Sequence, residues 1–484
     1  MMDTADQELI AQVHPPDWVN PVPADRYNLV VIGGGTAGLV AAAGAAGLGA
    51  RVALVERHLL GGDCLNTGCV PSKTLISSAR AHLPFSDAMA RVRRTRAAIA
   101  PHDSAYRFRS LGVDVFFGDA RFADPETIVV GGQRLRFARG VIATGARPVI
   151  PPIPGLAGAS PFTSESVFDL VEAPPRMAVI GGGPIGCELA QAFERLGIDV
   201  VLFTDQPRLL EREDAGASAV VEQALQRDGV RLVLGARIGR VDVREGVRAI
   251  AYEAHGGAGV ADVDAVLVST GRTPNVEGLN LDAAGVARDP SGAVRIDDFL
   301  RTTNPRIYAC GDVCLPWKFT HAADAAARIV IQNALFAVGP LGRRRLSELT
   351  MSWCTYTDPE VAHAGLSERE AGERGIDIDT YTQPLTTVDR AITDDATDGF
   401  VTIHARRGSG VIVGATIVAP HAGDLISEVS VAMRGKVSLG ALASAIHPYP
   451  TYAEAIRTCG DLYNRTRLTP RVKALVEWWL RRRR

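Results

Sequence analysis

Residues 28–57 read NLVVIGGGTAGLVAAAGAAGLGARVALVER, and this stretch decides the fold. An apolar strand runs into Gly33, Gly35 and Gly38, an Ala-rich helix follows, and a second strand ends at Glu56. The first glycine permits a tight turn, the second lets the backbone approach a pyrophosphate, and the third lets helix and strand pack closely. The helix N-terminus offers free N–H groups to phosphates, and Glu56 stands where an acid accepts hydrogen bonds from a ribose. The stretch therefore predicts a dinucleotide-binding βαβ unit.

A second copy of this pattern occupies residues 177–205, MAVIGGGPIGCELAQAFERLGIDVVLFTD. Two copies predict two nucleotides held in two domains. At the end of the second strand, Thr204 stands where NAD-specific units carry an acid, and Asp205 follows it. Asp205 would repel a 2′-phosphate, which favours NADH, although Arg208 lies close enough in sequence to keep NADPH open. The glycines of this second motif are Gly181, Gly183 and Gly186.

The composition excludes several classes of function. The 484 residues are 46% hydrophobic and 22% charged, with a net charge of −2. These values predict a globular protein of about three domains and give no reason to expect a nucleic-acid partner. No apolar run reaches the roughly 20 residues of a membrane-spanning helix, and the acidic, polar residues 1–16 do not resemble a secretory signal. We therefore expect a cytoplasmic protein without a transmembrane segment.

Two of the seven cysteines have a spacing with a ready mechanism. Cys64 and Cys69 are five residues apart, and Pro71 follows where it suits the first turn of a helix. Cys69 would then lie at a helix N-terminus, where the helix dipole stabilises a thiolate, and Lys73 adds a cation. A zinc site would need two further ligands at metal spacing, and none lie close in sequence, so we predict no metal site. The pair predicts a redox-active disulfide, with two structural thiols as the alternative.

The string GGDCLNTGCVPSK (residues 61–73) resembles the redox-disulfide signature of the class I pyridine nucleotide–disulfide oxidoreductases. These include lipoamide dehydrogenase, glutathione reductase and mercuric reductase. The similarity runs from about residue 26 to about residue 465 and includes ATG (143–145), STGRTPN (269–275) and YACGDVC (308–314). It implies an α/β chain with two Rossmann-like domains, one for FAD and one for NADH or NADPH, plus an α+β C-terminal dimerisation domain. A homodimer is the assembly that it implies.

On this pattern we expect six segments along the chain. They are an N-terminal extension (1–26), the first part of the FAD-binding domain (27–156), the NAD(P)-binding domain (157–275), the second part of the FAD-binding domain (276–347), the dimerisation domain (348–468) and an amphipathic basic segment (469–484).

The resemblance also implies roles for individual residues. Cys69 would be the sulfur nearest the flavin, and Cys64 the thiol that exchanges with the acceptor. Lys73 and Glu188 would pair beside flavin N5, and Asp312 would bind the ribityl chain. The other residues expected to bind the two cofactors are Glu56, Gly33, Gly35, Gly38, Thr144, Gly145, Gly181, Gly183, Gly186 and Gly271.

The C-terminal region departs from the disulfide reductases at one position. Those enzymes supply a base from a His-Pro-Thr-x-x-Glu motif of the partner subunit, with the Glu orienting the His. Here Pro450–Glu454 aligns with Pro-Thr-x-x-Glu, and Tyr449 stands in the base position. With a pKa of about 10 against about 6.5 for histidine, a tyrosine offers roughly three decades less free base, or about 4 kcal/mol of barrier. His447 shares a face with Tyr449 in an extended segment and is a candidate displaced base, with a packing histidine as the alternative.

A tyrosine at this position, and the string REDA (212–215), are similar to mercuric reductases. Those enzymes end in a vicinal cysteine pair, and here the sequence ends VKALVEWWLRRRR. We therefore predict an NAD(P)H-dependent flavoprotein reductase of an oxidised small-molecule or metal-ion acceptor such as Hg(II), with its delivery of mercury in doubt. The alternatives are a lipoamide or other small-disulfide oxidoreductase with a displaced base, and a flavin-binding redox sensor or assembly subunit. For residues 469–484 we favour packing on the protein's own dimer over contact with an anionic membrane surface.

Overall fold

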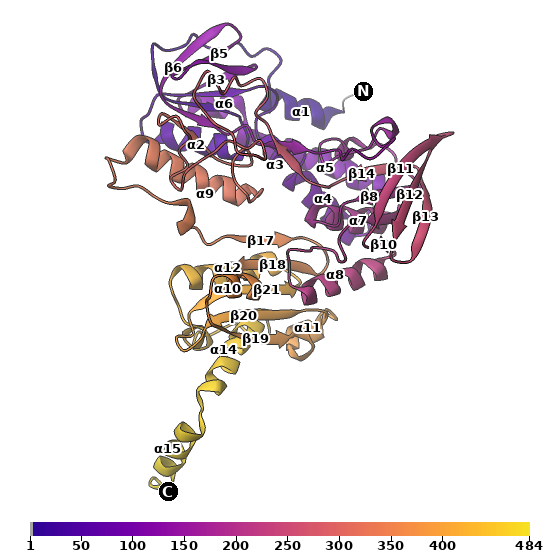
Figure 1. Ribbon diagram of the computed structural model, residues 1–484, viewed down its shortest axis with the longest axis vertical. Helices are drawn as coiled ribbons and strands as arrows, with labels where there is room; N and C mark the ends of the chain where they lie inside the picture. Colours follow the sequence, from indigo (N-terminus) through magenta and orange to yellow (C-terminus); the bar gives the residue numbers. More distant parts are fainter. Residues whose placement is uncertain (1–2) are drawn as a thin grey trace. The chain divides into compact units, whose positions relative to one another are not determined.

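The computed structural model describes residues 3–484 and leaves Met1 and Met2, at the start of the predicted N-terminal extension, outside that range (Figure 1). The chain forms two compact units. Unit 1 comprises the described residues up to Gly181, Ala192–Val201 and Arg237–Leu349. Unit 2 comprises Gly182–Gln191, Leu202–Ala236 and Thr350–Arg484.

The main sheet of unit 1 has seven strands in the order β3-β2-β1-β6-β5-β4, with β16 paired to β6. Five strands run parallel to one another: β1 (Tyr27–Ile32), β2 (Val52–Glu56), β3 (Val113–Phe117), β6 (Gln133–Ile142) and β16 (Ile307–Ala309). β4 (Ala120–Asp124) and β5 (Thr127–Val130) pair antiparallel at one edge. The apolar runs of β1 and β2 are buried almost throughout, as a parallel sheet covered on both faces requires. The βαβ unit predicted for residues 28–57 is confirmed.

Helices cover this sheet and carry the cysteine pair. α2 (Thr36–Gly47) follows β1 directly, and α9 (Thr320–Ile331) packs on it, so closely that a Cβ on Gly44 would lie 2.6 Å from Ile331. α3 (Gly62–Asn66) and α4 (Cys69–Arg80) come next in the chain, followed by α5 (Phe85–Ile99) and α6 (Ala105–Ser110). Ahead of the sheet, α1 (Thr4–Val13) docks on α5, where Arg96 pairs with Asp6 at 3.0 Å.

The second dinucleotide motif forms the strand–turn–helix that its sequence predicts. β8 (Arg176–Ile180) pairs in parallel with β14 (Ala265–Val268), and α7 (Pro184–Arg195) starts directly after Gly183. β9 (Asp199–Phe203), α8 (Ala215–Asp228) and β10 (Arg231–Val233) follow in the chain. An antiparallel meander of β11 (Arg237–Arg244), β12 (Val247–Ala254) and β13 (Gly257–Val263) comes before β14, and β15 (Arg272–Pro274) pairs with β7 (Ala146–Pro148).

Unit 2 contains a five-stranded antiparallel sheet in the order β17-β18-β21-β20-β19. The strands are β17 (Ser352–Thr355), β18 (Glu360–Gly365), β19 (Ile378–Pro384), β20 (Phe400–Arg406) and β21 (Ile412–Ala419). α12 (Ala422–Arg434), α13 (Leu439–Ala443) and α14 (Glu454–Arg467) contribute apolar residues to the same core. The short helices α10 (Glu368–Glu373) and α11 (Asp389–Thr393) lie in connections, and α15 (Pro470–Arg481) follows α14. The predicted combination of Rossmann-like units with an α+β C-terminal region is confirmed.

Within residues 3–484, no helix has both the length and the apolarity that crossing a bilayer requires.

Candidate active site

The glycines of the first motif divide into two that the fold needs and one that it leaves free. Gly33 has a φ of +108°, and a Cβ there would lie 2.3 Å from the carbonyl oxygen of Ala143. A Cβ on Gly38 would lie 1.7 Å from the carbonyl oxygen of Gly33. At Gly35 the nearest atom to such a Cβ is the Gly62 Cα, at an ordinary 3.6 Å. The turn and the helix–strand packing therefore require Gly33 and Gly38, whereas Gly35 borders space that a ligand can enter.

Glu56 is fixed at the end of β2 by two backbone donors. Its carboxylate accepts hydrogen bonds from the N–H of Gly34 at 2.5 Å and from the N–H of His58 at 2.7 Å. The glycine turn and the acid expected to hold the ribose are thus locked to each other.

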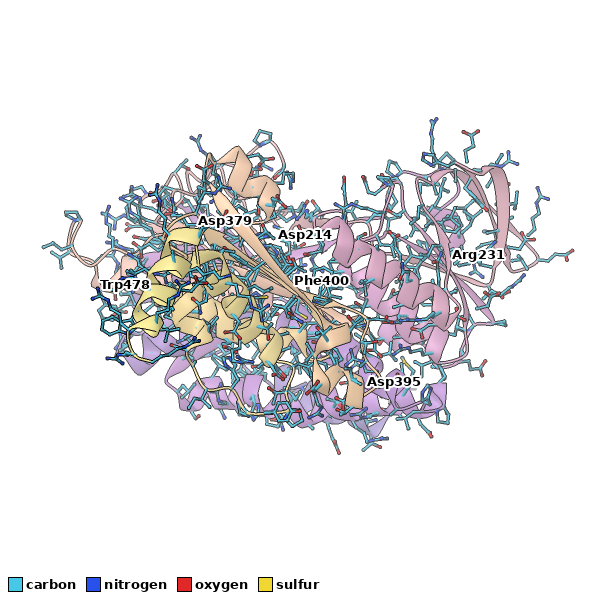
Figure 2. The ribbon with its side chains drawn as sticks, turned by 90° about the horizontal axis from the view of Figure 1, so that it is seen from below. Asp214, Arg231, Asp379, Asp395, Phe400 and Trp478 are labelled. Carbon is cyan, nitrogen blue, oxygen red and sulfur yellow. The ribbon has the colours of Figure 1, made fainter. Side chains whose placement is uncertain are left out.

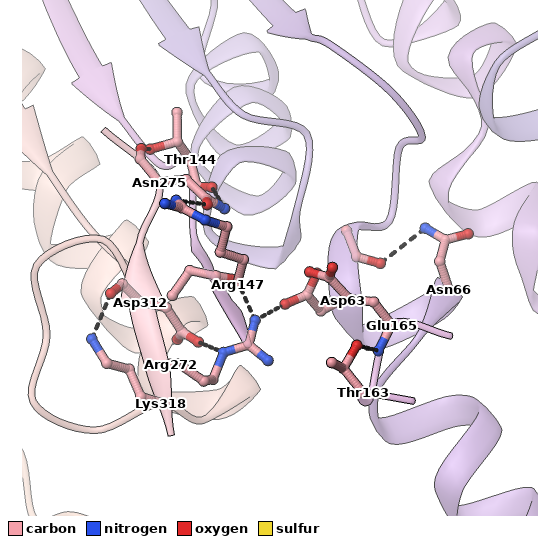
Figure 3. A network of polar contacts seen from close by, with 12 residues as sticks. Asp63, Asn66, Thr144, Arg147, Thr163, Glu165, Arg272, Asn275, Asp312 and Lys318 are labelled. Atoms are coloured by element: carbon pink, nitrogen blue, oxygen red, sulfur yellow. Dashed lines mark hydrogen bonds and ion pairs between the residues drawn. The ribbon is translucent and has the colours of Figure 1, made fainter. Parts of the chain in front are cut away.

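Arg272 of the STGRTPN string links two acids that flank the predicted flavin position (Figure 3). Its guanidinium pairs with Asp63, the residue before Cys64, and its Nε lies 3.6 Å from Asp312 Oδ2. Within residues 3–484 this buried Nε has no hydrogen-bond partner. Burial raises the pKa of the Asp312 carboxyl, and the charge of Arg272 opposes that shift. The unused Nε donor of the half-buried Arg272 and the N–H groups at the glycine turn could donate hydrogen bonds to polar groups of FAD at the residues expected to hold it.

The ATG string (143–145) and the STGRTPN string (269–275) are joined by reciprocal hydrogen bonds, also visible in Figure 3. Thr144 Oγ1 donates to the Asn275 carbonyl at 2.6 Å, and Asn275 Nδ2 donates to the Thr144 carbonyl at 3.0 Å. Gly145 has a φ of +69° and Gly271 has a φ of +142°, so the chain turns at a glycine in each of the two strings. The ATG and GRTPN strings, 131 positions apart, therefore form one structural feature.

The second glycine motif repeats the same division of labour. A Cβ on Gly181 (φ +124°) would lie 2.6 Å from the Ser269 carbonyl oxygen, whereas no atom of residues 3–484 lies within 4 Å of a Cβ placed on Gly183. Gly183 thus borders open space at the start of α7, where a pyrophosphate is expected.

Arg208, which the sequence left open as a phosphate ligand, points elsewhere. Its guanidinium donates to the carbonyl oxygens of Glu213 at 2.8 Å and Glu211 at 2.6 Å. Asp205 is exposed beside Thr204 at the end of β9. Binding a 2′-phosphate through Arg208 would require these two hydrogen bonds to break.

The cysteine pair lies on two consecutive helices. Cys64 is inside α3, and Cys69 is the first residue of α4, as its spacing to Pro71 predicts. Cys64 is half-buried and Cys69 is exposed. Cys69 Sγ lies 3.3 Å from the hydroxyl oxygen of Thr320, the first residue of α9. A hydrogen bond with Cys69 and burial raise the pKa of the Cys64 thiol, and Thr320 opposes this shift.

A cavity of about 150 Å³ opens in front of Cys64. Asp103, which ends the 3₁₀ turn Ala100–Asp103, contributes its one charged side chain, and burial raises the pKa of that carboxyl. The remaining lining residues are apolar or small: Thr36, Leu39, Val40, Gly61, Leu65, Val70 and Ile99. Cys64 therefore borders a largely apolar pocket with one acid.

Lys73 and Glu188 belong to different units. Lys73 lies on α4 of unit 1, one turn after Cys69. Glu188 lies on α7 in unit 2, where it is buried and accepts a hydrogen bond from the N–H of Tyr356 at 2.9 Å. Their pairing beside a flavin stays a prediction. Gly186 of the same helix likewise keeps its predicted role at the nicotinamide nucleotide.

Tyr449 of unit 2 is hydrogen-bonded to an acid that lies outside its own sequence motif. Its hydroxyl donates to Asp389 Oδ2 at 2.7 Å, and this hydrogen bond raises the pKa of the exposed phenol. Glu454, the residue aligned to orient a histidine, begins α14. Its Oε1 lies 3.5 Å from Arg457, and its buried Oε2 has no hydrogen-bond partner within residues 3–484. Tyr449 is therefore arranged to hold its proton.

His447 is half-buried and held at both ring nitrogens. Nε2 lies 2.7 Å from Glu428 Oε1 on α12, and Nδ1 lies 3.1 Å from the Ala445 carbonyl oxygen. Both contacts are made to oxygen atoms, so each ring nitrogen of His447 is already engaged within unit 2.

Four side chains around these sites escaped the sequence motifs: Asp103, Thr320, Asp389 and Glu428. Each contacts its partner across a distance in the chain, 251 residues for Thr320 and Cys69 and 60 for Asp389 and Tyr449. Only Thr320 carried a local signal, because it opens the helical pattern THAADAAAR after the GD pair.

Comparisons with known proteins agree with this geometry. The family model for pyridine nucleotide-disulphide oxidoreductases matches residues 27–327, and the model for the dimerisation domain of that family matches residues 351–459. A mercuric reductase of Staphylococcus aureus is 36% identical over 448 residues, covering 89% of this chain and 81% of the relative. A dihydrolipoyl dehydrogenase of Thermus scotoductus is 31% identical over 459 residues, covering 90% and 97%.

Solved structures show the same fold. The Cu(II) complex of the HOCl-induced flavoprotein disulfide reductase RclA from Escherichia coli matches with a TM-score of 0.83 and 28% identity, covering 91% of this chain and 100% of that one. LpdA from Mycobacterium tuberculosis matches with a TM-score of 0.82 and 27% identity, with the same coverage. These relatives are FAD-containing, NAD(P)H-dependent enzymes, and FAD and a nicotinamide nucleotide are the cofactors of this chain. The protein belongs to the pyridine nucleotide-disulphide oxidoreductase family.

Proposed function

We propose that this enzyme reduces a thiophilic metal ion, Hg(II) or Cu(II), with NADH as electron donor. The observation that carries the proposal is the pocket of about 150 Å³ in front of Cys64, whose only charged lining residue is Asp103. A carboxylate attracts a cation and repels an anionic disulfide such as oxidised glutathione. Soft metal ions prefer thiolate ligands, and the two cysteines supply them.

The electrons balance over one cycle. When bound, FAD relays the two electrons of the nicotinamide hydride to the cysteine pair. The Cys64–Cys69 disulfide takes up two electrons and two protons and becomes the dithiol. The metal ion displaces those protons and accepts the two electrons, and the S–S bond re-forms. Hg(II) leaves as Hg(0), whereas a copper cycle reduces two Cu(II) ions to Cu(I).

The residues of this chain have distinct tasks in the proposal. Thr320 orients the thiol pair through its hydrogen bond to Cys69. Tyr449 donates its hydroxyl proton to a hydrogen bond with Asp389, so it does not act as the base that dihydrolipoamide oxidation needs. Lys73 and Glu188 keep their predicted place beside the flavin. The metal ion is the substrate in this proposal; among residues 3–484 no group of three or more His, Cys, Asp or Glu side chains could hold a metal ion.

The alternative acceptor is lipoamide or another small disulfide, with His447 as a displaced base. The dihydrolipoyl dehydrogenase relative supports it. The contacts of His447 with Glu428 and Ala445 count against it, because they occupy both ring nitrogens.

We also propose an oligomeric state, a domain organisation and a location for this protein. The dimerisation-domain match to residues 351–459 supports a homodimer. We retain the six predicted segments and a cytoplasmic location, where NADH is available.

An acceptor panel tests the function. The FAD-loaded protein is assayed anaerobically with NADH and NADPH against Hg(II), Cu(II), lipoamide, oxidised glutathione and a quinone. We expect the highest kcat/KM with NADH and one of the metal ions, and no turnover for Cys64→Ala. Cys459→Ala, which removes a buried thiol of unit 2, is the matched control and keeps full activity. If lipoamide is the fastest acceptor and Tyr449→Phe leaves its rate unchanged, the proposal is wrong.

A further inference from the structure

Residues 464–484 form an exposed segment at the far end of unit 2. Every residue in this range is exposed, although residues 470–481 are helical (Figure 1). The helix α15 is capped in the normal way, with the Thr469 hydroxyl accepting from the Val472 N–H and Pro470 at the first helical position. The sequence thus specifies a helix here, but no other element of unit 2 covers it.

The helix is amphipathic. Val472, Leu475, Val476 and Trp479 are spaced i, i+3, i+4, i+7 and so share one face, and each is between 43% and 63% exposed. Lys473, Glu477 and Arg481 recur every four residues on the opposite face. A monomeric soluble protein rarely leaves such an apolar face exposed, so we expect a partner surface or a membrane to cover it.

The charge of residues 469–484 indicates what covers the apolar face of α15. Residues 469–484 carry six basic side chains against one acid, Glu477, in a chain whose overall net charge is −2. The arginines crowd next to the aromatic end, with the Arg482 guanidinium 4.1 Å from the Trp478 ring centroid and that of Arg483 4.6 Å from Trp479. Figure 2 shows Trp478 at the outer edge of unit 2, away from the sheet residues Phe400 and Asp379.

We propose that residues 469–484 bind an anionic phospholipid surface, with the apolar face of α15 in the interface and the basic residues at the headgroups. Indole rings favour the headgroup level, and each Lys or Arg near the surface adds attraction to anionic lipid. Packing of α15 on the same helix of a second copy would bring two sets of six basic side chains together, which like-charge repulsion opposes. The proposal does not depend on which acceptor the enzyme reduces.

The test is co-sedimentation of the full-length, FAD-loaded protein with vesicles. We expect binding to equimolar phosphatidylglycerol and phosphatidylcholine at low salt, little binding to pure phosphatidylcholine, and release by raised salt. Arg482→Gln, Arg483→Gln and Arg484→Gln combined should lower the partition coefficient about 100-fold. Trp478→Ala with Trp479→Ala should also release the protein. The matched control changes the exposed Arg231, Arg237 and Arg244 to Gln and keeps binding.

Sedimentation velocity of the variant that ends at Leu468 distinguishes membrane binding from the alternative, in which α15 packs on a second copy of the chain. We expect this variant to lose vesicle binding while keeping the oligomeric state and the NADH-dependent activity with soluble acceptors. Dissociation into monomers would show that α15 packs on its own dimer and would overturn the proposal. Equal binding to pure phosphatidylcholine, equal loss in the control variant, or no binding of the intact protein at low salt would overturn it too.

Discussion

The hydroxyl of Tyr449 donates a hydrogen bond to Asp389 Oδ2 at 2.7 Å, from the position where the sequence motif leads us to expect a histidine base. The carboxylate favours the protonated phenol and raises its pKa. The side chain in the position of the expected base therefore keeps its proton and donates a hydrogen bond.

Asp389→Asn should lower the pKa of the Tyr449 phenol, because the neighbouring negative charge is lost. Phenolate absorbance, followed against pH, measures this pKa, and Tyr449→Phe identifies which of the tyrosine titrations belongs to residue 449. An unchanged titration in Asp389→Asn would mean that the carboxylate does not control this phenol in solution.

Thr320→Val should make the cysteine pair less reactive. The Thr320 hydroxyl lowers the pKa of Cys64, so its removal raises that pKa and reduces the thiolate fraction about tenfold at neutral pH. The rate of alkylation of the reduced enzyme by iodoacetamide measures the effect. Thr320→Ser keeps the hydroxyl and should restore the rate; a serine variant as slow as the valine variant would point to packing instead.

Asp103→Asn should make the Cys64 thiol more reactive and weaken the binding of the metal acceptor. The charge of Asp103 raises the pKa of Cys64, so its loss speeds alkylation of that thiol. The same change removes the only charged side chain of the pocket, so KM for Hg(II) or Cu(II) should rise about tenfold. A merely structural role would slow both reactions together. Asp103→Glu is the conservative control and should stay close to the native values.

Gly38→Ala and Gly183→Ala should differ although both lie in dinucleotide motifs. A Cβ at Gly38 meets the Gly33 carbonyl oxygen at 1.7 Å, so the first βαβ unit must distort and FAD should be lost. A Cβ at Gly183 meets no atom within 4 Å, so fold and FAD content should survive while KM for NADH rises about tenfold. Flavin absorbance and steady-state kinetics measure the two effects. Normal KM for NADH in Gly183→Ala would remove this turn from the nucleotide site.

Glu213 should make the stability of unit 2 depend on pH. Burial raises its pKa from 4.5 to about 7, and the Trp353 indole N–H donates to its Oε1 at 2.5 Å. The fold favours the protonated acid, so the stabilisation is complete below pH 4.5 and is lost as pH rises through 7. The loss amounts to at most about 3 kcal/mol. Urea unfolding at acidic and neutral pH should show this fall, and Glu213→Gln should flatten it, whereas Glu373→Gln on the exposed surface should not.

The sequence by itself determined the two nucleotide motifs, the cysteine pair and the helix that begins at Cys69. These features are local: a strand, a glycine turn and a helix within about 30 residues already contain the chemistry that specifies them. The absence of the expected histidine at position 449 was also legible, because it is a matter of residue identity within one short motif.

Only the tertiary structure decided which partners these residues meet. Thr320 reaches Cys69 because α9 packs on α2, Asp103 faces Cys64 because a 3₁₀ turn returns to the pocket, and Asp389 meets Tyr449 across the connections of unit 2. His447 changes from a candidate base to a paired histidine once Glu428 of α12 lies 2.7 Å from it. Such pairings depend on long-range packing of helices and sheets, which no periodicity or spacing in the sequence records.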